Sequence, residues 1–198
     1  MSWTGRGKRP SPSGHEPGGA WWDQESATLE KTVAGDGLKL TILRATGLLV
    51  DLSRVKNIYD ALDARSADYE VFSPMFEGPG SPELAAELQE ELAAYNSQVV
   101  LVDRVWLAPA WRGHGVGRLL TARLLGWVCP DPMVALMPSP IALDEKQQED
   151  EATFNQEMAK VRRTWKSVGF RPYGKDIMIM DPAMVHHGEA EDKLGLPQ

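Results

Sequence analysis

Cysteine is almost absent from this chain. Of its 198 residues only Cys129 is a cysteine, so no disulfide can form within the chain. A lone thiol of this kind is typical of proteins in a reducing compartment, and we expect a cytoplasmic protein. Cys129 stands beside Trp127 and Val128, a setting more typical of a small core residue than of a nucleophile.

Long apolar runs and an excess of positive charge are also missing. No apolar stretch reaches the length that a bilayer requires, and the first residues lack the hydrophobic segment of a signal peptide, so no membrane partner is predicted. The chain has 28 acidic and 21 basic residues and a formal charge of −7. This balance argues against nucleic acid as a partner. Metal-ligand spacing of cysteine, histidine and carboxylate is not found either, so no metal is predicted.

The 42% apolar content is enough for one sizeable core, which we place in residues 25–182. Residues 1–24, rich in glycine, proline and serine, predict a disordered arm, and the polar residues 183–198 predict a flexible tail. Spacing and turn residues predict two strands at 27–33 and 38–43 joined by Gly35-Asp36-Gly37, and further strands at 133–137 and 177–180. They also predict a helix near 55–64, a helix from Pro82 capped by Ser81, and a helix with an apolar stripe from Phe154 to Trp165 that ends at a C′ glycine, Gly169, with Phe170 as its hydrophobic partner.

The most informative stretch is residues 98–127. The run from Val99 to Leu107 is apolar except at Asp103 and Arg104 and predicts a strand buried on two sides. A loop at 112–117 follows, with three glycines in five positions, and apolar residues then recur at helical spacing from Val116.

A glycine loop that leads into a helix predicts an anion site. Glycines let the backbone N–H groups converge, and the helix dipole adds positive potential there. Arg112 and Arg118 flank the loop and suit phosphate oxygens, so a diphosphate is the expected ligand. A simple tight turn is the alternative, but it requires neither three glycines nor two arginines. The G-x-G-x-x-G spacing of dinucleotide sites and the Gly-Lys-Ser/Thr of phosphate-binding loops are both absent.

The stretch instead resembles the acyl-CoA signature of the GNAT superfamily of N-acetyltransferases. That signature is a strand, then Pro-x-x-Arg-x-x-Gly-x-Gly or Ala, then a leucine-rich helix. The residues that match it here are Pro109, Arg112, Gly115, Gly117, Leu119 and Leu120. With Gly169-Phe170 included, the resemblance covers roughly residues 38–181. With Pro138 and Pro140 included as well, the chain looks like a member of an uncharacterised bacterial subgroup of the superfamily.

The resemblance implies an α/β (α+β) protein with the GNAT fold: a central mixed sheet, the CoA-binding strand–loop–helix and flanking helices. It implies acetyl-CoA as the acyl donor, with its pantetheine arm in a gap between the central strand and the diverging strand that follows. The residues implied to bind this cofactor are Val105, Trp106, Leu107, Arg112, Gly113, His114, Gly115, Val116, Gly117 and Arg118.

The implied activity is direct transfer of an acetyl group to a primary amine of a small-molecule or peptide acceptor. Asp103 is the first candidate for the base that takes the amine proton, and an ion pair with Arg104 or another arginine is the alternative. Glu70 and Asp63 follow as further candidates. Trp165 stands where many members carry a proton-donating tyrosine, and Tyr173 is the candidate replacement, with simple packing as its alternative.

Two features depart from the family pattern. A helix is predicted just before the central strand, where a common member has a hairpin. The missing phenol at position 165 and the tryptophan-containing arm also leave open a second reading: a GNAT-fold module that binds acyl-CoA or a protein partner without transferring an acyl group. A homodimer is left open as well.

Overall fold

The computed structural model describes residues 3–4, 30–32, 39–40, 42–78, 80–91, 97–128, 132–140, 143 and 148–181. Cys129, the turn Gly35-Asp36-Gly37, the C-terminal tail and the arm apart from residues 3–4 lie outside this set. Three short strands form an antiparallel sheet in the order β1 (Trp3–Thr4), β2 (Glu30–Thr32) and β3 (Lys39–Leu40). The pairing of β2 with β3 agrees with the two strands predicted around the turn.

The main sheet has five strands in the order β4-β5-β6-β8-β7. Its members are β4 (Leu43–Asp51), β5 (Gln98–Leu107), β6 (Met133–Leu136), β7 (Arg171–Tyr173) and β8 (Ile177–Met180). Within this sheet β5 and β6 run parallel, and the other neighbouring pairs are antiparallel. The mixed sheet with its helices confirms the α+β class. The sequence reading missed β7, an edge strand in which Pro172 can be accommodated.

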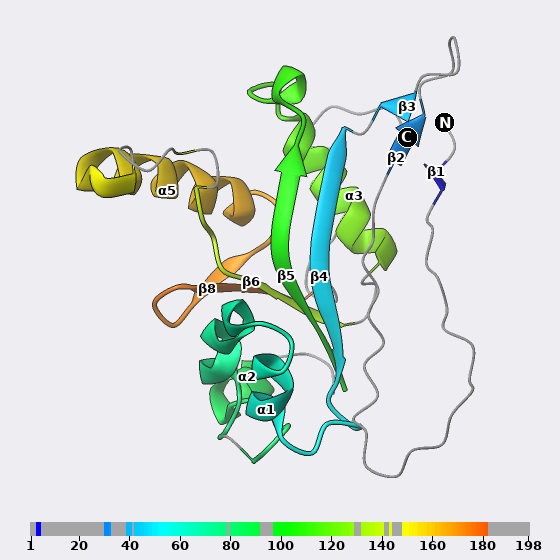
Figure 1. The fold of residues 1–198 in the computed structure, drawn as a ribbon, viewed down its shortest axis with the longest axis vertical. Coiled ribbons are helices and arrows are strands. Elements are labelled where there is room, and N and C mark those ends of the chain that lie inside the picture. Colours follow the sequence, from blue (N-terminus) through cyan, green and yellow to red (C-terminus); the bar gives the residue numbers. More distant parts are fainter. Residues whose placement is uncertain are drawn as a thin grey trace.

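Helices cover both faces of the main sheet (Figure 1). The first face carries α1 (Ile58–Asp63), the 3-10 helix η1 (Ala67–Met75) and α2 (Ala86–Glu91). The second face carries α3 (Val116–Val128) and the end of α5 (Glu151–Lys166), and the short 3-10 helix η2 (Pro109–Trp111) connects β5 to the glycine loop. Side chains of β5 alternate between the two faces of the sheet and so contribute to both cores. Val99 and Leu101 face η1 and α2, whereas Val102 faces α3.

The segment before α2 corrects one prediction. The helix expected from Pro82 begins at Ala86 instead. Ser81 does accept a hydrogen bond from the Glu83 N–H at 3.1 Å, as a cap would. However, Leu84 forms an antiparallel bridge with Phe76, and the Ala85 N–H donates to the Met75 carbonyl at 2.8 Å. These tertiary hydrogen bonds hold the chain extended through Leu84, so the helix starts later.

The end of α5 confirms the expected glycine stop. Gly169 has φ of +105°, and the Phe170 N–H donates to the Trp165 carbonyl at 3.1 Å. The Gly169 N–H donates to Lys166 at 3.2 Å, which completes a Schellman motif. The rings of Trp165 and Phe170 meet edge to face with centroids 5.1 Å apart, so the motif also anchors the helix to the core. Along α5 itself no residue is buried, because the rest of the helix projects from the sheet (Figure 1).

A β-bulge interrupts the pairing of β4 with β5. Thr46 lies opposite Arg104 and the next residue, Gly47, lies opposite Val102, so Asp103 has no partner on β4. The bulge depends on a glycine, since a Cβ at position 47 would lie 2.7 Å from the Leu101 carbonyl oxygen. A backbone oxygen cannot move away as the end of a flexible side chain can.

We predict that Gly47→Ala lowers the free energy of unfolding by about 1–3 kcal/mol, as overpacking against fixed backbone does. Gly78→Ala is the matched control, because a Cβ at Gly78 meets no atom within 4 Å. Chemical denaturation of both variants and the parent measures the difference. Equal stability of the two variants would show that the bulge accepts a side chain.

Candidate cofactor and acceptor site

A cavity of about 340 Å³ opens where β5 and β6 separate. Their parallel pairing runs from Val99 and Met133 to Val102 and Leu136 and goes no further. Pro138 and Pro140 follow β6 and have no N–H to continue the ladder. The second half of β5 therefore has no strand beside it on this side, within the part of the chain that the structure describes, and its backbone polar groups face the cavity.

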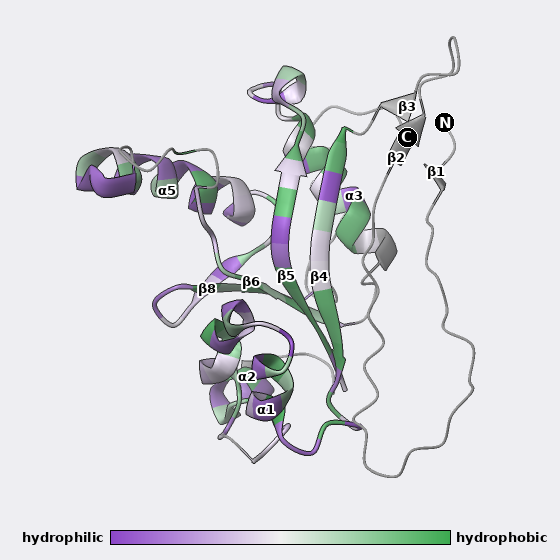
Figure 2. Cartoon of the chain, viewed as in Figure 1, coloured by the Kyte–Doolittle hydropathy of each residue, from purple (hydrophilic) through white to green (hydrophobic). Residues whose placement is uncertain are grey.

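The cavity is bounded by four segments. Figure 2 shows that the hydropathy of β5 changes along the strand: hydrophilic residues occupy its middle, between hydrophobic stretches. The lining comes from β5 and Leu43, the chain after β6, the glycine loop with α3, and α5: Leu43, Val102, Asp103, Arg104, Val105, Leu107, Leu136, Met137, Ser139, Pro140, Leu143, Arg112, Gly117, Arg118, Thr121, Glu157, Val161, Thr164, Trp165 and Val168. The lining is largely apolar with a few polar groups, as is usual for small-molecule sites.

Five of the ten residues predicted to bind the cofactor line this cavity: Val105, Leu107, Arg112, Gly117 and Arg118. The other five are Trp106, Gly113, His114, Gly115 and Val116, which lie in the same strand, loop and helix start but do not line the cavity. The structure thus places half of the set at the cavity and the other half next to it.

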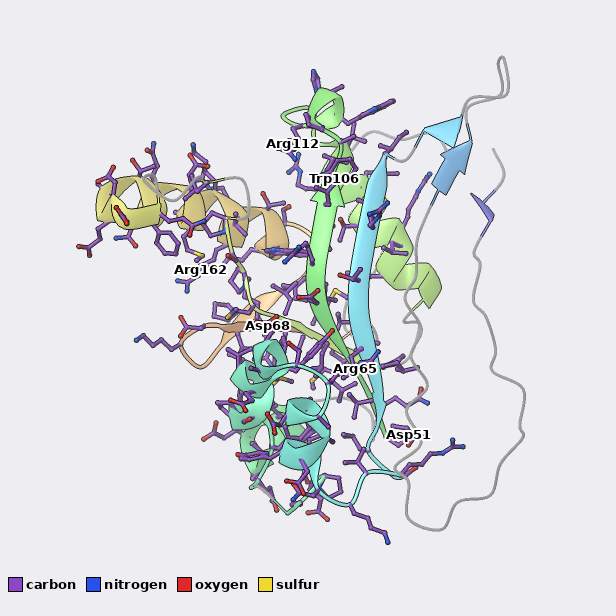
Figure 3. The ribbon with its side chains drawn as sticks, viewed as in Figure 1. Asp51, Arg65, Asp68, Trp106, Arg112 and Arg162 are labelled. Carbon is purple, nitrogen blue, oxygen red and sulfur yellow. The ribbon has the colours of Figure 1, made fainter. Side chains whose placement is uncertain are left out.

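The glycine loop has the backbone form that the sequence predicts. Gly113 and Gly115 have φ of +80° and +74°, values that residues with a side chain rarely adopt. The Arg112 Nε donates to the Leu107 carbonyl at 3.0 Å, which ties the loop to the end of β5. Figure 3 shows Arg112 beyond the tip of β5, on the side toward α5. Together with Arg118 and the start of α3, this arrangement can bind an anion at the mouth of the cavity.

Asp103 reaches the cavity from the bulge. Its carboxylate accepts a hydrogen bond from the Thr46 hydroxyl at 3.1 Å. It forms no ion pair with Arg104 or with any other residue in the described ranges, so the expected alternative, a structural ion pair, is not seen. The carboxylate is exposed, and the group that donates to it is a neutral hydroxyl.

Tyr69 lies on η1 and does not line the cavity, but its phenol interacts electrostatically with Asp103. Burial and the negative charge of Asp103 both raise the pKa of the Tyr69 phenol, whereas Arg65 lowers it. Tyr69 stands in a polar run, residues 61–70. Figure 3 shows Arg65 and Asp68 on this segment, beside β5. The Tyr69 phenol on η1 and the Asp103 carboxylate on β5 therefore influence each other electrostatically.

The remaining catalytic candidates lie away from the cavity. Glu70 on η1 and Asp63 at the end of α1 are exposed, and neither lines it. The Tyr173 phenol donates to the Pro74 carbonyl at 3.2 Å, so it links β7 to η1, in agreement with the packing alternative. The reason is topological: β7 is the edge strand, and β8 and β6 separate it from β5. Trp165 does line the cavity, where its indole forms a wall and supplies no acid.

Comparisons with known proteins add no relative: no protein-family model, curated protein or solved structure matches this chain. In the described ranges no helix is both long and apolar enough to cross a membrane. The same ranges contain no group of three or more side chains that could hold a metal ion.

The proximity of Asp103 and Tyr69 can be tested without any ligand. We predict that Asp103→Asn lowers the pKa of Tyr69, because it removes a negative charge that opposes the phenolate, while burial still keeps the pKa above its ordinary value. Tyrosinate absorbance against pH, with the Tyr69→Phe titration subtracted, measures the shift. An unchanged titration curve would show that the Asp103 charge does not act on the Tyr69 phenol.

The sign for stability follows from the same shift. The pKa of Tyr69 is higher in the folded chain than in the unfolded one. The contribution of Tyr69 to the free energy of unfolding is therefore complete below the ordinary tyrosine pKa, and it is lost as the pH rises through the raised value.

Proposed function

We propose that this chain is an acyl-CoA-dependent N-acetyltransferase with the GNAT fold, which moves an acetyl group from acetyl-CoA to a primary amine. The observation that carries the proposal is the separation of β5 from β6 beside a glycine loop, a helix start and two arginines. A donor with a diphosphate at one end and an amide-bearing arm needs both parts: an anion site, and unpaired backbone next to it.

The residues divide naturally between the two parts of such a donor. Arg112, Arg118 and the backbone of residues 113–117 would hold the diphosphate, and this includes the loop residues that do not line the cavity. Val105 and Leu107 line the course of the arm along β5. Trp165 closes the opposite wall from α5 and excludes water from the thioester.

The proposed transfer requires one group that takes the proton of the amine and one that stabilises the oxyanion. An amine attacks as the neutral base, so a group in the site must take its proton, and Asp103 is the carboxylate that the bulge presents to the cavity. Thr46 orients this carboxylate through its hydroxyl. A backbone N–H of β5 that no strand pairs can stabilise the oxyanion. The net charge of −7 suits a cationic acceptor, small molecule or peptide.

A binding module without transferase activity is the second candidate. The observation in its favour is that none of the tyrosines in the described ranges lines the cavity, so those residues supply the leaving thiolate with no phenol as a proton donor. Water can take that role, and the glycine loop and paired arginines would serve either function. A cytoplasmic location and a homodimer remain predictions from the sequence.

The first experiment tests cofactor binding. We predict that Gly115→Glu abolishes CoA binding measured by calorimetry, because it adds bulk and negative charge where the diphosphate would lie. Gly174→Glu is the matched control: Gly174 also has positive φ, +59°, but lies in the turn between β7 and β8. Strain and charge are therefore similar in both variants, and only the position differs.

Parent-like CoA affinity in a folded Gly115→Glu protein would remove the diphosphate site from the proposal. Equal loss in both glutamate variants would trace the effect to folding. Thermal melting of each variant shows which case applies.

The second experiment tests transfer. We predict that the parent releases free CoA thiol from acetyl-CoA when an accepted amine from a panel is present. Asp103→Asn should lower turnover by about 100-fold or more with unchanged acetyl-CoA affinity, because an amide cannot take the proton. Asp60→Asn, the same change at an exposed position on α1, should turn over like the parent.

The outcomes separate the two candidate functions. CoA binding without thiol release across the amine and peptide panel favours the binding module. Thiol release that Asp103→Asn leaves intact keeps the transferase and assigns the proton to another group.

A further inference from the structure

Thr121 is the one buried polar side chain among the residues whose burial is described. It is 5% exposed, and it lies on the second turn of α3, where it lines the cavity. Every other buried residue in the core of the described chain is hydrophobic. A hydroxyl at this depth therefore needs a physical reason.

The Thr121 hydroxyl has no hydrogen-bond partner among the described residues. A helical threonine can satisfy itself by donating to the carbonyl one turn earlier, and Thr164 on α5 does so, to the Lys160 carbonyl at 3.0 Å. Thr121 has the same option in principle at Gly117 and does not use it. Leaving a buried hydroxyl without a partner costs folding free energy that valine, with the same shape, would avoid.

The position of Thr121 indicates what it can bind. It follows Gly117 by four residues, so it lies about 6 Å deeper along α3 than the glycine loop. In an acyl-CoA the first polar groups beyond the diphosphate, toward the thiol, are the hydroxyl and the first amide of the pantetheine arm. Both lie at about the depth of one helical turn from the phosphates. A threonine hydroxyl can donate to the amide carbonyl or accept from the hydroxyl.

We infer that Thr121 is a recognition residue for the pantetheine arm, with its hydroxyl hydrogen-bonded to the hydroxyl–amide segment next to the diphosphate. The inference rests on the proposed acyl-CoA function and adds a specific contact from α3. Through this contact Thr121 raises the affinity for an acyl-CoA relative to a ligand that carries only the nucleotide diphosphate. It also explains why the core contains a hydroxyl that weakens its own packing.

The test compares Thr121→Val and Thr121→Ser with the parent, using CoA and ADP as ligands. ADP keeps the diphosphate and lacks the pantetheine arm. Calorimetry should show that Thr121→Val binds CoA about tenfold more weakly and binds ADP as the parent does, because one hydrogen bond is lost at the arm only. Thr121→Ser keeps the hydroxyl and should retain most of the CoA affinity.

Melting temperature distinguishes the proposed role from a purely structural one, because loss of a structural hydroxyl in Thr121→Val would lower it. Thr121→Val should melt at the same temperature as the parent or higher, because it removes an unpaired buried hydroxyl. Weaker CoA binding in an equally or more stable protein is the expected combination. A valine variant that melts lower would show that the hydroxyl has a partner within the fold and would overturn the inference.

Two further results would overturn it while leaving the proposed function in place: unchanged CoA affinity in Thr121→Val, or equal weakening of CoA and ADP. The second result would place the effect at the diphosphate site. A parent protein that binds neither ligand contradicts the proposed function itself, and the assignment of Thr121 fails with it.

Discussion

Parallel pairing of β5 with β6 lasts for four residue pairs, from Val99 and Met133 to Val102 and Leu136, and the site depends on where it stops. Before that point both strands are buried between two helical layers. After it, two prolines carry the chain away from β5 without N–H groups for a ladder. Backbone that would otherwise be satisfied within the sheet is left facing a cavity, and a free sheet edge inside a protein favours a ligand that can pair with it.

The bulge at Asp103 adds a second constraint at the same place. A regular strand would pair Asp103 with a residue of β4, but the extra residue frees it and lets Thr46 donate to its carboxylate. Gly47 allows the backbones to approach closely enough for this register. Burial and the negative charge of Asp103 also raise the pKa of the Tyr69 phenol.

The lining of the cavity is less tightly packed and more polar than the two cores. The buried clusters on the two faces consist of aliphatic and aromatic side chains, whereas the cavity contains an unpaired hydroxyl at Thr121 and only partly buried residues on α5. Trp165 belongs to both regions, since its ring packs edge to face with that of Phe170 and also lines the cavity. Residues of the core and residues of the cavity lining thus lie side by side along α3 and the last turns of α5.

Local chemistry in the sequence was enough to predict several parts of this protein. The apolar run of β5, the glycine loop that leads into α3 and the glycine stop after α5 all follow from residues close together in the chain. Each depends on short-range backbone sterics or side-chain periodicity, which a single sequence displays directly. The mixed α+β class follows from the same patterns, and so does the presence of Arg112 and Arg118 at the loop.

Tertiary structure alone decided which residues share the site. Thr46 on β4 donates to Asp103 on β5, and Tyr173 on the edge strand β7 donates to Pro74, because strand order and the bulge register bring these residues together. The late start of α2 comes from the hydrogen bond between Ala85 and Met75, which overrides a local capping signal. Whether Thr121 is satisfied within its helix is likewise a matter of three-dimensional packing, since helical periodicity specifies which face a residue occupies and leaves its hydrogen-bond partner undetermined.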